Sequence, residues 1–61
     1  MTNHDVRIRL WQIHCPIWKL AAELGVSENT VGRWLRLPLS EDHSRRVEAA
    51  LRNLEAQHAG R

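Results

Sequence analysis

The sequence has few of the residues that cross-link a small protein or fill its core with aromatic rings. Its 61 residues include one cysteine and neither phenylalanine nor tyrosine. Cys15 alone cannot close an internal disulfide, so we expect a reducing, cytoplasmic environment and a thiol that fills a small apolar space. No apolar run approaches the roughly 18 residues of a membrane span, and the first residues lack signal-peptide character. We therefore expect a single domain over residues 1–55, neither secreted nor membrane-spanning.

Clusters of chemically reactive residues are also missing from the sequence. The four histidines are scattered singly, and no pair of cysteines or histidines has the spacing of a zinc site. Neither a phosphate-binding glycine-rich loop nor a nucleophile motif occurs. We therefore expect no enzyme activity, no catalytic residue, no metal, no cofactor and no small-molecule substrate.

Positive charge is concentrated in the N-terminal half. Residues 7–36 hold five basic and two acidic side chains, whereas residues 37–61 hold four of each kind. This bias favours a polyanionic partner, but a solvated charged surface explains it equally well.

The spacing of apolar residues predicts an all-α, compact bundle of about four short helices and no strand. The first helix is predicted over about residues 5–14, with Asn3 or Asp5 as a candidate N-cap. The second follows a proline and is predicted over residues 17–24. It is expected to end at Gly25, a residue that readily adopts the left-handed conformation of a helix end.

Two serines are predicted to begin the remaining helices. Ser27 is expected to cap a third helix that runs to about residue 36, and Ser40 a fourth. Residues 56–61 carry no apolar stripe, so we expect them to form a flexible C-terminal tail. The apolar stripe of the fourth helix consists of Val47, Ala50, Leu51 and Leu54.

The third helix is predicted to have two different sides. At about 100° per residue, Val31, Trp34 and Leu35 fall on one side, which we expect to face the core. Ala21 lies where the second helix is expected to cross it closely, since a larger side chain would hold the two apart. The polar residues fall within an arc of about 140° on the other side. They are Glu28, Asn29, Gly32, Arg33 and Arg36.

Ile8 and Trp11 are apolar residues that lie away from the main stripe of the first helix, which is formed by Val6, Leu10 and Ile13. We expect the fourth helix to pack against Ile8 and Trp11. The alternative is that this apolar surface forms a homodimer interface.

A stretch in the middle of the chain resembles a known family. Residues 20–35 read LAAELGVSENTVGRWL, which is similar to the helix-turn-helix of lambda-repressor/Cro-type DNA-binding proteins. The likeness rests on Ala21, on Gly25 with an apolar residue after it, and on Val31 with another apolar residue three positions later. It implies a DNA-binding domain whose motif spans about residues 17–36.

The flanking residues 16–21 and 35–40 resemble those of small stand-alone members from bacterial phages and mobile elements. The resemblance implies a sequence-specific transcriptional regulator, a repressor by default, that acts on double-stranded DNA at the nucleoid, in the bacterial cytoplasm. A homodimer would suit a palindromic operator with half-sites about one helical turn apart. One departure is Ile17, where the class often has a glutamine that helps to hold a phosphate.

In this class the second helix of the motif enters the major groove. Arg33 suits guanine, Asn29 adenine and Glu28 cytosine, while Gly32 permits close approach of the backbone. The base contacts implied by the resemblance are therefore Glu28, Asn29, Gly32 and Arg33. The implied contacts to the DNA backbone are Trp18, Lys19, Ser27, Thr30 and Arg36.

Two alternative functions stay open. The first is an excisionase-type accessory recombination factor, which would bend DNA, although the sequence has no obvious minor-groove wedge or β-wing. The second is a helical interaction module that does not bind DNA, such as an antitoxin-like or anti-repressor partner. That module predicts no salt-dependent affinity for DNA.

Overall fold

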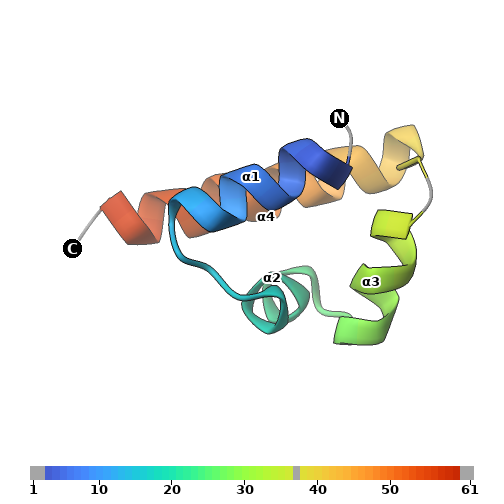
Figure 1. The fold of residues 1–61 in the computed structure, drawn as a ribbon, viewed down its shortest axis with the longest axis horizontal. Coiled ribbons are helices and arrows are strands. Elements are labelled where there is room, and N and C mark those ends of the chain that lie inside the picture. Colours follow the sequence, from blue (N-terminus) through green and yellow to red (C-terminus); the bar gives the residue numbers. More distant parts are fainter. Residues whose placement is uncertain (1–2, 37, 60–61) are drawn as a thin grey trace.

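The computed structural model describes residues 3–36 and 38–59, and this part of the chain contains four helices and no strand. The helices are α1 (Asn3–Gln12), α2 (Ile17–Leu24), α3 (Glu28–Arg36) and α4 (Glu41–Ala59). α1 and α4 lie side by side, and α2 and α3 lie together on one side of that pair (Figure 1). The prediction of an all-α bundle of four helices is confirmed. None of these helices combines the length and apolar character needed to cross a membrane.

All four helices contribute to one hydrophobic core. Burying a leucine or valine side chain completely stabilises the fold by about 1.5–3 kcal/mol, so a few side chains account for much of the favourable free energy of folding. The predicted stripe of α4 is buried as a whole, and Ala21 is buried at 3% exposure. The ten buried residues are Val6, Leu10, Leu20, Ala21, Val31, Leu35, Val47, Ala50, Leu51 and Leu54.

The end of α2 is defined by a glycine in the left-handed conformation. Gly25 has φ 74° and ψ 29°. Its N–H donates to the carbonyl oxygen of Ala22 at 3.2 Å, and the N–H of Val26 donates to that of Ala21 at 3.0 Å. These two bonds satisfy carbonyls that the helix leaves open and turn the chain toward α3. The predicted helix end at Gly25 is confirmed.

α1 ends in the same backbone arrangement, with a histidine in the glycine position. His14 has φ 52°, and its N–H donates to the carbonyl oxygen of Trp11 at 3.0 Å. The next N–H, of Cys15, donates to that of Leu10 at 2.8 Å. Because a side chain with a Cβ crowds the backbone at positive φ, we expect His14 to destabilise this turn relative to glycine by about 1 kcal/mol.

Serine side chains cap α3 and α4 as predicted. The Oγ of Ser27 accepts a hydrogen bond from the backbone N–H of Thr30 at 3.2 Å. The Oγ of Ser40 accepts one from the N–H of His43 at 3.1 Å. Each serine thereby satisfies one of the open donors of its first helical turn.

The start of α1 differs from its prediction. α1 covers residues 3–12 and not 5–14, so Asp5 lies inside the helix and is not its N-cap. Asn3 does not cap α1 through its side chain either, because its Nδ2 donates to the backbone carbonyl oxygen of Leu35. This bond ties the beginning of α1 to the last turn of α3.

α1 also packs on α4 through a different face from the predicted one. Ile8 is 41% exposed and Trp11 is 75% exposed, so the expectation that they receive the fourth helix is wrong. Next to the buried Val6 and Leu10, it is Arg9 that contacts α4: its Nη2 and Nε donate to the carboxylate of Glu55 at 2.6 and 3.0 Å, and its Nη1 donates to Glu48. Two carboxylates of α4 thus attract the basic flank of α1 and leave its Ile8–Trp11 flank in solvent.

α4 is longer than predicted. We expected a tail without regular structure from residue 56, but the helix continues to Ala59. Ala, Gln and His at these exposed positions need no apolar stripe to extend a helix that is already anchored, and Ala and Gln favour helix intrinsically. The last two residues of the predicted tail, 60–61, lie outside the described part of the chain.

Cys15 lies in the link between α1 and α2. It is partly buried and packs against the hydrophobic core. Burial raises the pKa of its thiol, although nearby Lys19 acts in the opposite direction. The thiol therefore stays protonated at neutral pH, which agrees with the expected role of filling an apolar space.

Candidate nucleic-acid interface

One side of α3 is fixed against the rest of the protein. Val31 and Leu35 are buried in the core. Trp34 is partly buried and closes the edge of the core: its ring stacks on that of His43 with centroids 3.9 Å apart and an interplanar angle of 14°. The guanidinium of Arg46 lies 5.3 Å from the centre of the same ring. Trp34 therefore faces the protein, as predicted, but at its margin, where two polar side chains of α4 cover it.

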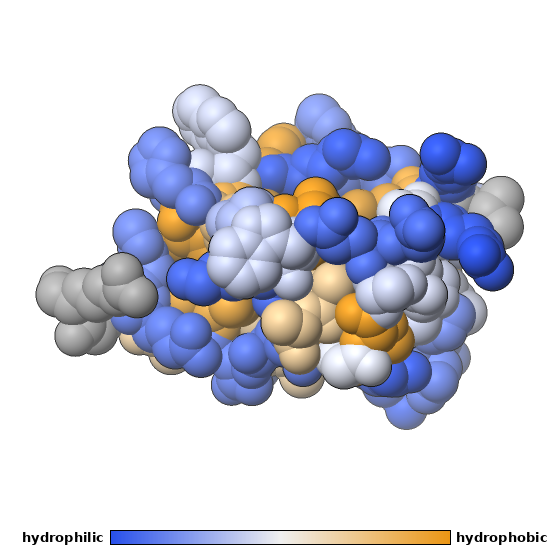
Figure 2. Space-filling view, turned by 90° about the horizontal axis from the view of Figure 1, so that it is seen from below, coloured by the Kyte–Doolittle hydropathy of each residue, from blue (hydrophilic) through white to orange (hydrophobic). Residues whose placement is uncertain are grey.

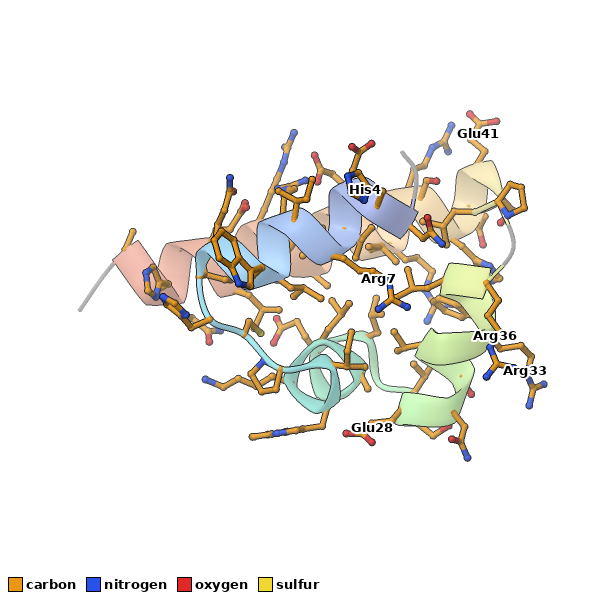
Figure 3. The ribbon with its side chains drawn as sticks, in the orientation of Figure 1. His4, Arg7, Glu28, Arg33, Arg36 and Glu41 are labelled. Carbon is orange, nitrogen blue, oxygen red and sulfur yellow. The ribbon has the colours of Figure 1, made fainter. Side chains whose placement is uncertain are left out.

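The other side of α3 forms a surface depression. Its polar side chains are exposed, and Gly32 is half-buried. Figure 3 shows Arg33 and Arg36 extending outward from this helix. The residues that line the depression are the five that the helical phase grouped together, so the predicted polar face is confirmed. They are Glu28, Asn29, Gly32, Arg33 and Arg36.

Gly32 is not required by the packing of the protein. A Cβ atom built at this position would meet no heavy atom within 4 Å other than those of the adjacent residues and of the backbone of α3 itself. Glycine in the interior of a helix is less stable than alanine by roughly 1 kcal/mol. The chain thus carries a destabilising residue at a place where the fold tolerates a better one, and the result is a helix surface without a side chain between Asn29 and Arg33.

The arginines of the polar face have no partner within the described residues. Neither Arg33 nor Arg36 forms an ion pair or hydrogen bond with any residue of 3–36 or 38–59. By contrast, Arg9, Arg45 and Arg52 each pair with a glutamate of α4. The guanidinium donors of Arg33 and Arg36 are therefore available to an external anion or hydrogen-bond acceptor.

Arg9 belonged to the basic surplus of the N-terminal half, but it is not part of an anion-binding surface. Its side chain is 25% exposed and lies between Glu48 and Glu55. The hydrogen bonds from Arg9 lower the pKa of Glu55 and, in turn, raise the pKa of the guanidinium. The spacing of the two glutamates, seven residues apart on one side of α4, is the sequence signal that indicates such a cation site.

The hydroxyl groups of Ser27 and Thr30, both predicted DNA-backbone contacts, bond to each other. Their oxygens lie 3.0 Å apart, so one hydroxyl donates to the other. The backbone N–H of Thr30 also donates to Ser27, as described for the cap. The pair therefore retains one hydroxyl hydrogen for an external acceptor.

Trp18 and Lys19, predicted contacts from the first turn of α2, occupy different surroundings. Trp18 is 57% exposed. Lys19 is half-buried and lines another depression, together with His14 of the α1–α2 link and Leu54 of α4. The structure thus does not bring Lys19 into the depression of α3. Seen from the side of α2 and α3, hydrophilic side chains enclose several apolar patches (Figure 2).

Within residues 3–36 and 38–59, no three His, Cys, Asp or Glu side chains are grouped so that they could hold a metal ion. Comparison with protein-family models gives no match for this chain, and neither a curated protein nor a solved structure matches it. The assignment of a ligand therefore depends on the chemistry of the α3 depression itself.

Proposed function

We propose that this chain is a sequence-specific, double-stranded DNA-binding transcriptional regulator that reads the major groove with α3. The depression on α3 carries the proposal: two unpaired arginines, an amide and a carboxylate surround a glycine on a helix whose other side is buried. A firmly held helix with a hydrogen-bonding outer face suits the width and chemistry of the major groove. The resemblance of residues 20–35 to lambda-repressor/Cro-type proteins further supports a repressor of phage or mobile-element origin.

Three side chains of the depression supply the base contacts in this proposal. The guanidinium of Arg33 pairs with the O6 and N7 of guanine, and the amide of Asn29 with the N6 and N7 of adenine. Glu28 accepts a hydrogen bond from the N4 of cytosine, which offsets the repulsion between its carboxylate and the phosphates. Gly32 lets the backbone of α3 approach the bases between these contacts.

Other residues set the position of α3 on the duplex. Arg36, in the last turn of α3, binds a phosphate, and the exposed Trp18 packs against the sugar-phosphate backbone. The free hydroxyl hydrogen of the Ser27–Thr30 pair and the ammonium of Lys19 supply further phosphate contacts. These contacts add affinity and orientation without sequence information.

Selection of bound fragments from a random double-stranded library, followed by titration of the selected duplex, tests the proposal. We expect an enriched sequence and an affinity that falls steeply as the salt concentration rises. In Arg33→Ala, the binding free energy for the selected site should become less favourable by about 1–3 kcal/mol, and the preference at one base pair should relax.

Arg45→Ala is a matched control, because Arg45 is an exposed arginine of α4 that pairs with Glu41. It should leave the sequence preference unchanged. Selection without enrichment, together with no salt-dependent binding, would refute the proposed function. An equal loss for Arg33→Ala on every sequence would make Arg33 a phosphate contact and not a base contact.

The exposure of Ile8 and Trp11 favours one second candidate, a helical interaction module that acts through protein contacts. The same apolar surface offers a homodimer interface to the DNA-binding candidate. Sedimentation equilibrium at micromolar to high micromolar concentrations distinguishes a monomer from a dimer, and Trp11→Ser should weaken any dimer that uses this surface. A protein that self-associates but shows no salt-dependent DNA affinity would favour the second candidate.

A further inference from the structure

Two arginines on α1 have opposite surroundings. Arg7 and Arg9 lie on the two flanks of the buried pair formed by Val6 and Leu10. Arg9 is held between two glutamates of α4. Arg7 is exposed and forms neither an ion pair nor a hydrogen bond with any residue in the described part of the chain. An unpaired guanidinium is therefore present on the flank of α1 that α4 does not neutralise.

Arg7 lies close to the start of α2. It lines a surface depression together with Trp11, Pro16 and Ile17, all of them without a charged group. In the view of Figure 3, Arg7 extends toward the side where α2 and α3 lie, whereas His4 extends toward the opposite side. Arg7 is thus directed toward the part of the molecule that carries the unpaired arginines of α3.

The acidic residue of α2 does not neutralise this region. Glu23 accepts a hydrogen bond from Nδ2 of Asn53 at 3.1 Å and is thereby directed toward α4. Arg9, Arg45 and Arg52 are thus paired with glutamates of α4, and Arg46 donates to the carbonyl oxygen of Leu24 and lies over the ring of Trp34. Arg7, Arg33 and Arg36, on α1 and α3, have no such partner among the described residues.

We propose that Arg7 is a further phosphate contact of the DNA interface, an inference that rests on the proposed function. With α3 in the major groove, a guanidinium on α1 beside the start of α2 meets the DNA backbone that borders the groove. A contact from a second helix, separate from α3, restricts the angle at which α3 enters. It carries no base preference of its own, because every phosphate presents the same acceptor oxygens.

The salt dependence of binding tests this role independently of any operator sequence. Fluorescence anisotropy with a labelled pool of random-sequence duplexes of about 20 base pairs gives the slope of log K against log salt concentration. In Arg7→Ala, the magnitude of this slope should fall by about one. The ratio of wild-type to variant affinity should then shrink roughly 3.5-fold as salt rises from about 50 to 200 mM.

Two further variants separate a contact from an effect of net charge. Arg7→Lys keeps a cation at this position and should keep the wild-type slope. Arg45→Ala removes one positive charge from an exposed position of α4, where Arg45 pairs with Glu41, and should also keep it. Far-ultraviolet circular dichroism and thermal unfolding should show the same fold for all three variants, since both arginines are exposed.

The outcomes distinguish this inference from the proposed function. A wild-type slope that Arg7→Ala leaves unchanged overturns the role of Arg7 and leaves DNA binding by α3 in place. Equal reductions of the slope in Arg7→Ala and Arg45→Ala also overturn it, because they reduce the effect to net charge. Absence of salt-dependent binding by the wild-type chain overturns both proposals.

Discussion

Replacement of Gly32 by alanine separates the stability of α3 from its proposed contact with DNA. Alanine is more favourable than glycine in a helix interior by about 0.8–1.0 kcal/mol. Outside the neighbouring backbone of α3 itself, the new methyl group meets no heavy atom within 4 Å, so no packing contact opposes this gain. We expect Gly32→Ala to raise the free energy of unfolding by about 1 kcal/mol. For a domain of this size, the corresponding rise in Tm is about 4–8 °C, measurable by circular dichroism at the helix band.

The same substitution should weaken DNA binding. The methyl group would stand between Asn29 and Arg33, on the surface that the bases approach in the proposed complex. A displacement of α3 outward by its thickness lengthens the hydrogen bonds of both neighbours, and each good bidentate pair is worth about 1–3 kcal/mol. We therefore expect at least a roughly tenfold loss of affinity for the selected duplex.

Ala49→Gly is the matched control, because Ala49 is an exposed residue inside α4, away from the α3 depression. It should lower the stability by about 1 kcal/mol and leave DNA affinity unchanged. Lower stability in Gly32→Ala would contradict the open space at this position. Higher stability with unchanged DNA affinity would refute close approach of a duplex to Gly32 and weaken the proposed function.

Two further substitutions test the helix end and the ion pair. His14→Gly should stabilise the protein by about 0.5–1 kcal/mol in urea unfolding, because glycine adopts positive φ without strain; destabilisation would contradict the strain. Glu55→Gln should destabilise it by roughly 0.5–1.5 kcal/mol at pH 7, a value discounted because the pair is partly exposed. Arg9 lowers the pKa of Glu55 in the folded protein. The stabilisation is therefore complete above the ordinary pKa of glutamate, about 4.3, and disappears as pH falls through the lowered value. Unfolding curves at pH 7, 5, 4 and 3 should show the two proteins converging, and a difference independent of pH would exclude the carboxylate as its source.

Local signals made α2, α3 and the start of α4 predictable. Gly25, Ser27 and Ser40 act on the backbone within a few residues of themselves, and the structure uses each of them as expected. The faces of α3 were predictable for a similar reason, since a helix of regular pitch fixes which residues share a side. What a residue on the exposed side binds is not fixed by that pitch, so the DNA contacts remain predictions.

α1 was harder to predict because its neighbours decide which face it buries. Its own pattern places Ile8 and Trp11 on one flank and Arg9 on another, and it does not say which flank meets α4. The answer lies in Glu48 and Glu55, which are 39 and 46 residues away from Arg9 in the chain and attract it. The left-handed conformation of His14 was equally hard to predict, because this position lacks the glycine that usually indicates it. Helix ends that depend on tertiary packing carry little local signal.

The distribution of paired and unpaired arginines also affects how the molecule meets a highly charged partner. Glutamates next to Arg9, Arg45 and Arg52 reduce the field of these three arginines, whereas the field of Arg33 and Arg36 extends into solvent. Such a polarised molecule is turned by a polyanion while the two are still diffusing, so productive orientations occur in a larger share of collisions. Ions in the surrounding buffer shorten the reach of that field to about 8–10 Å near physiological strength. We therefore expect a polyanion to approach the α3 side more often than the side of the paired arginines, and added salt to slow its capture.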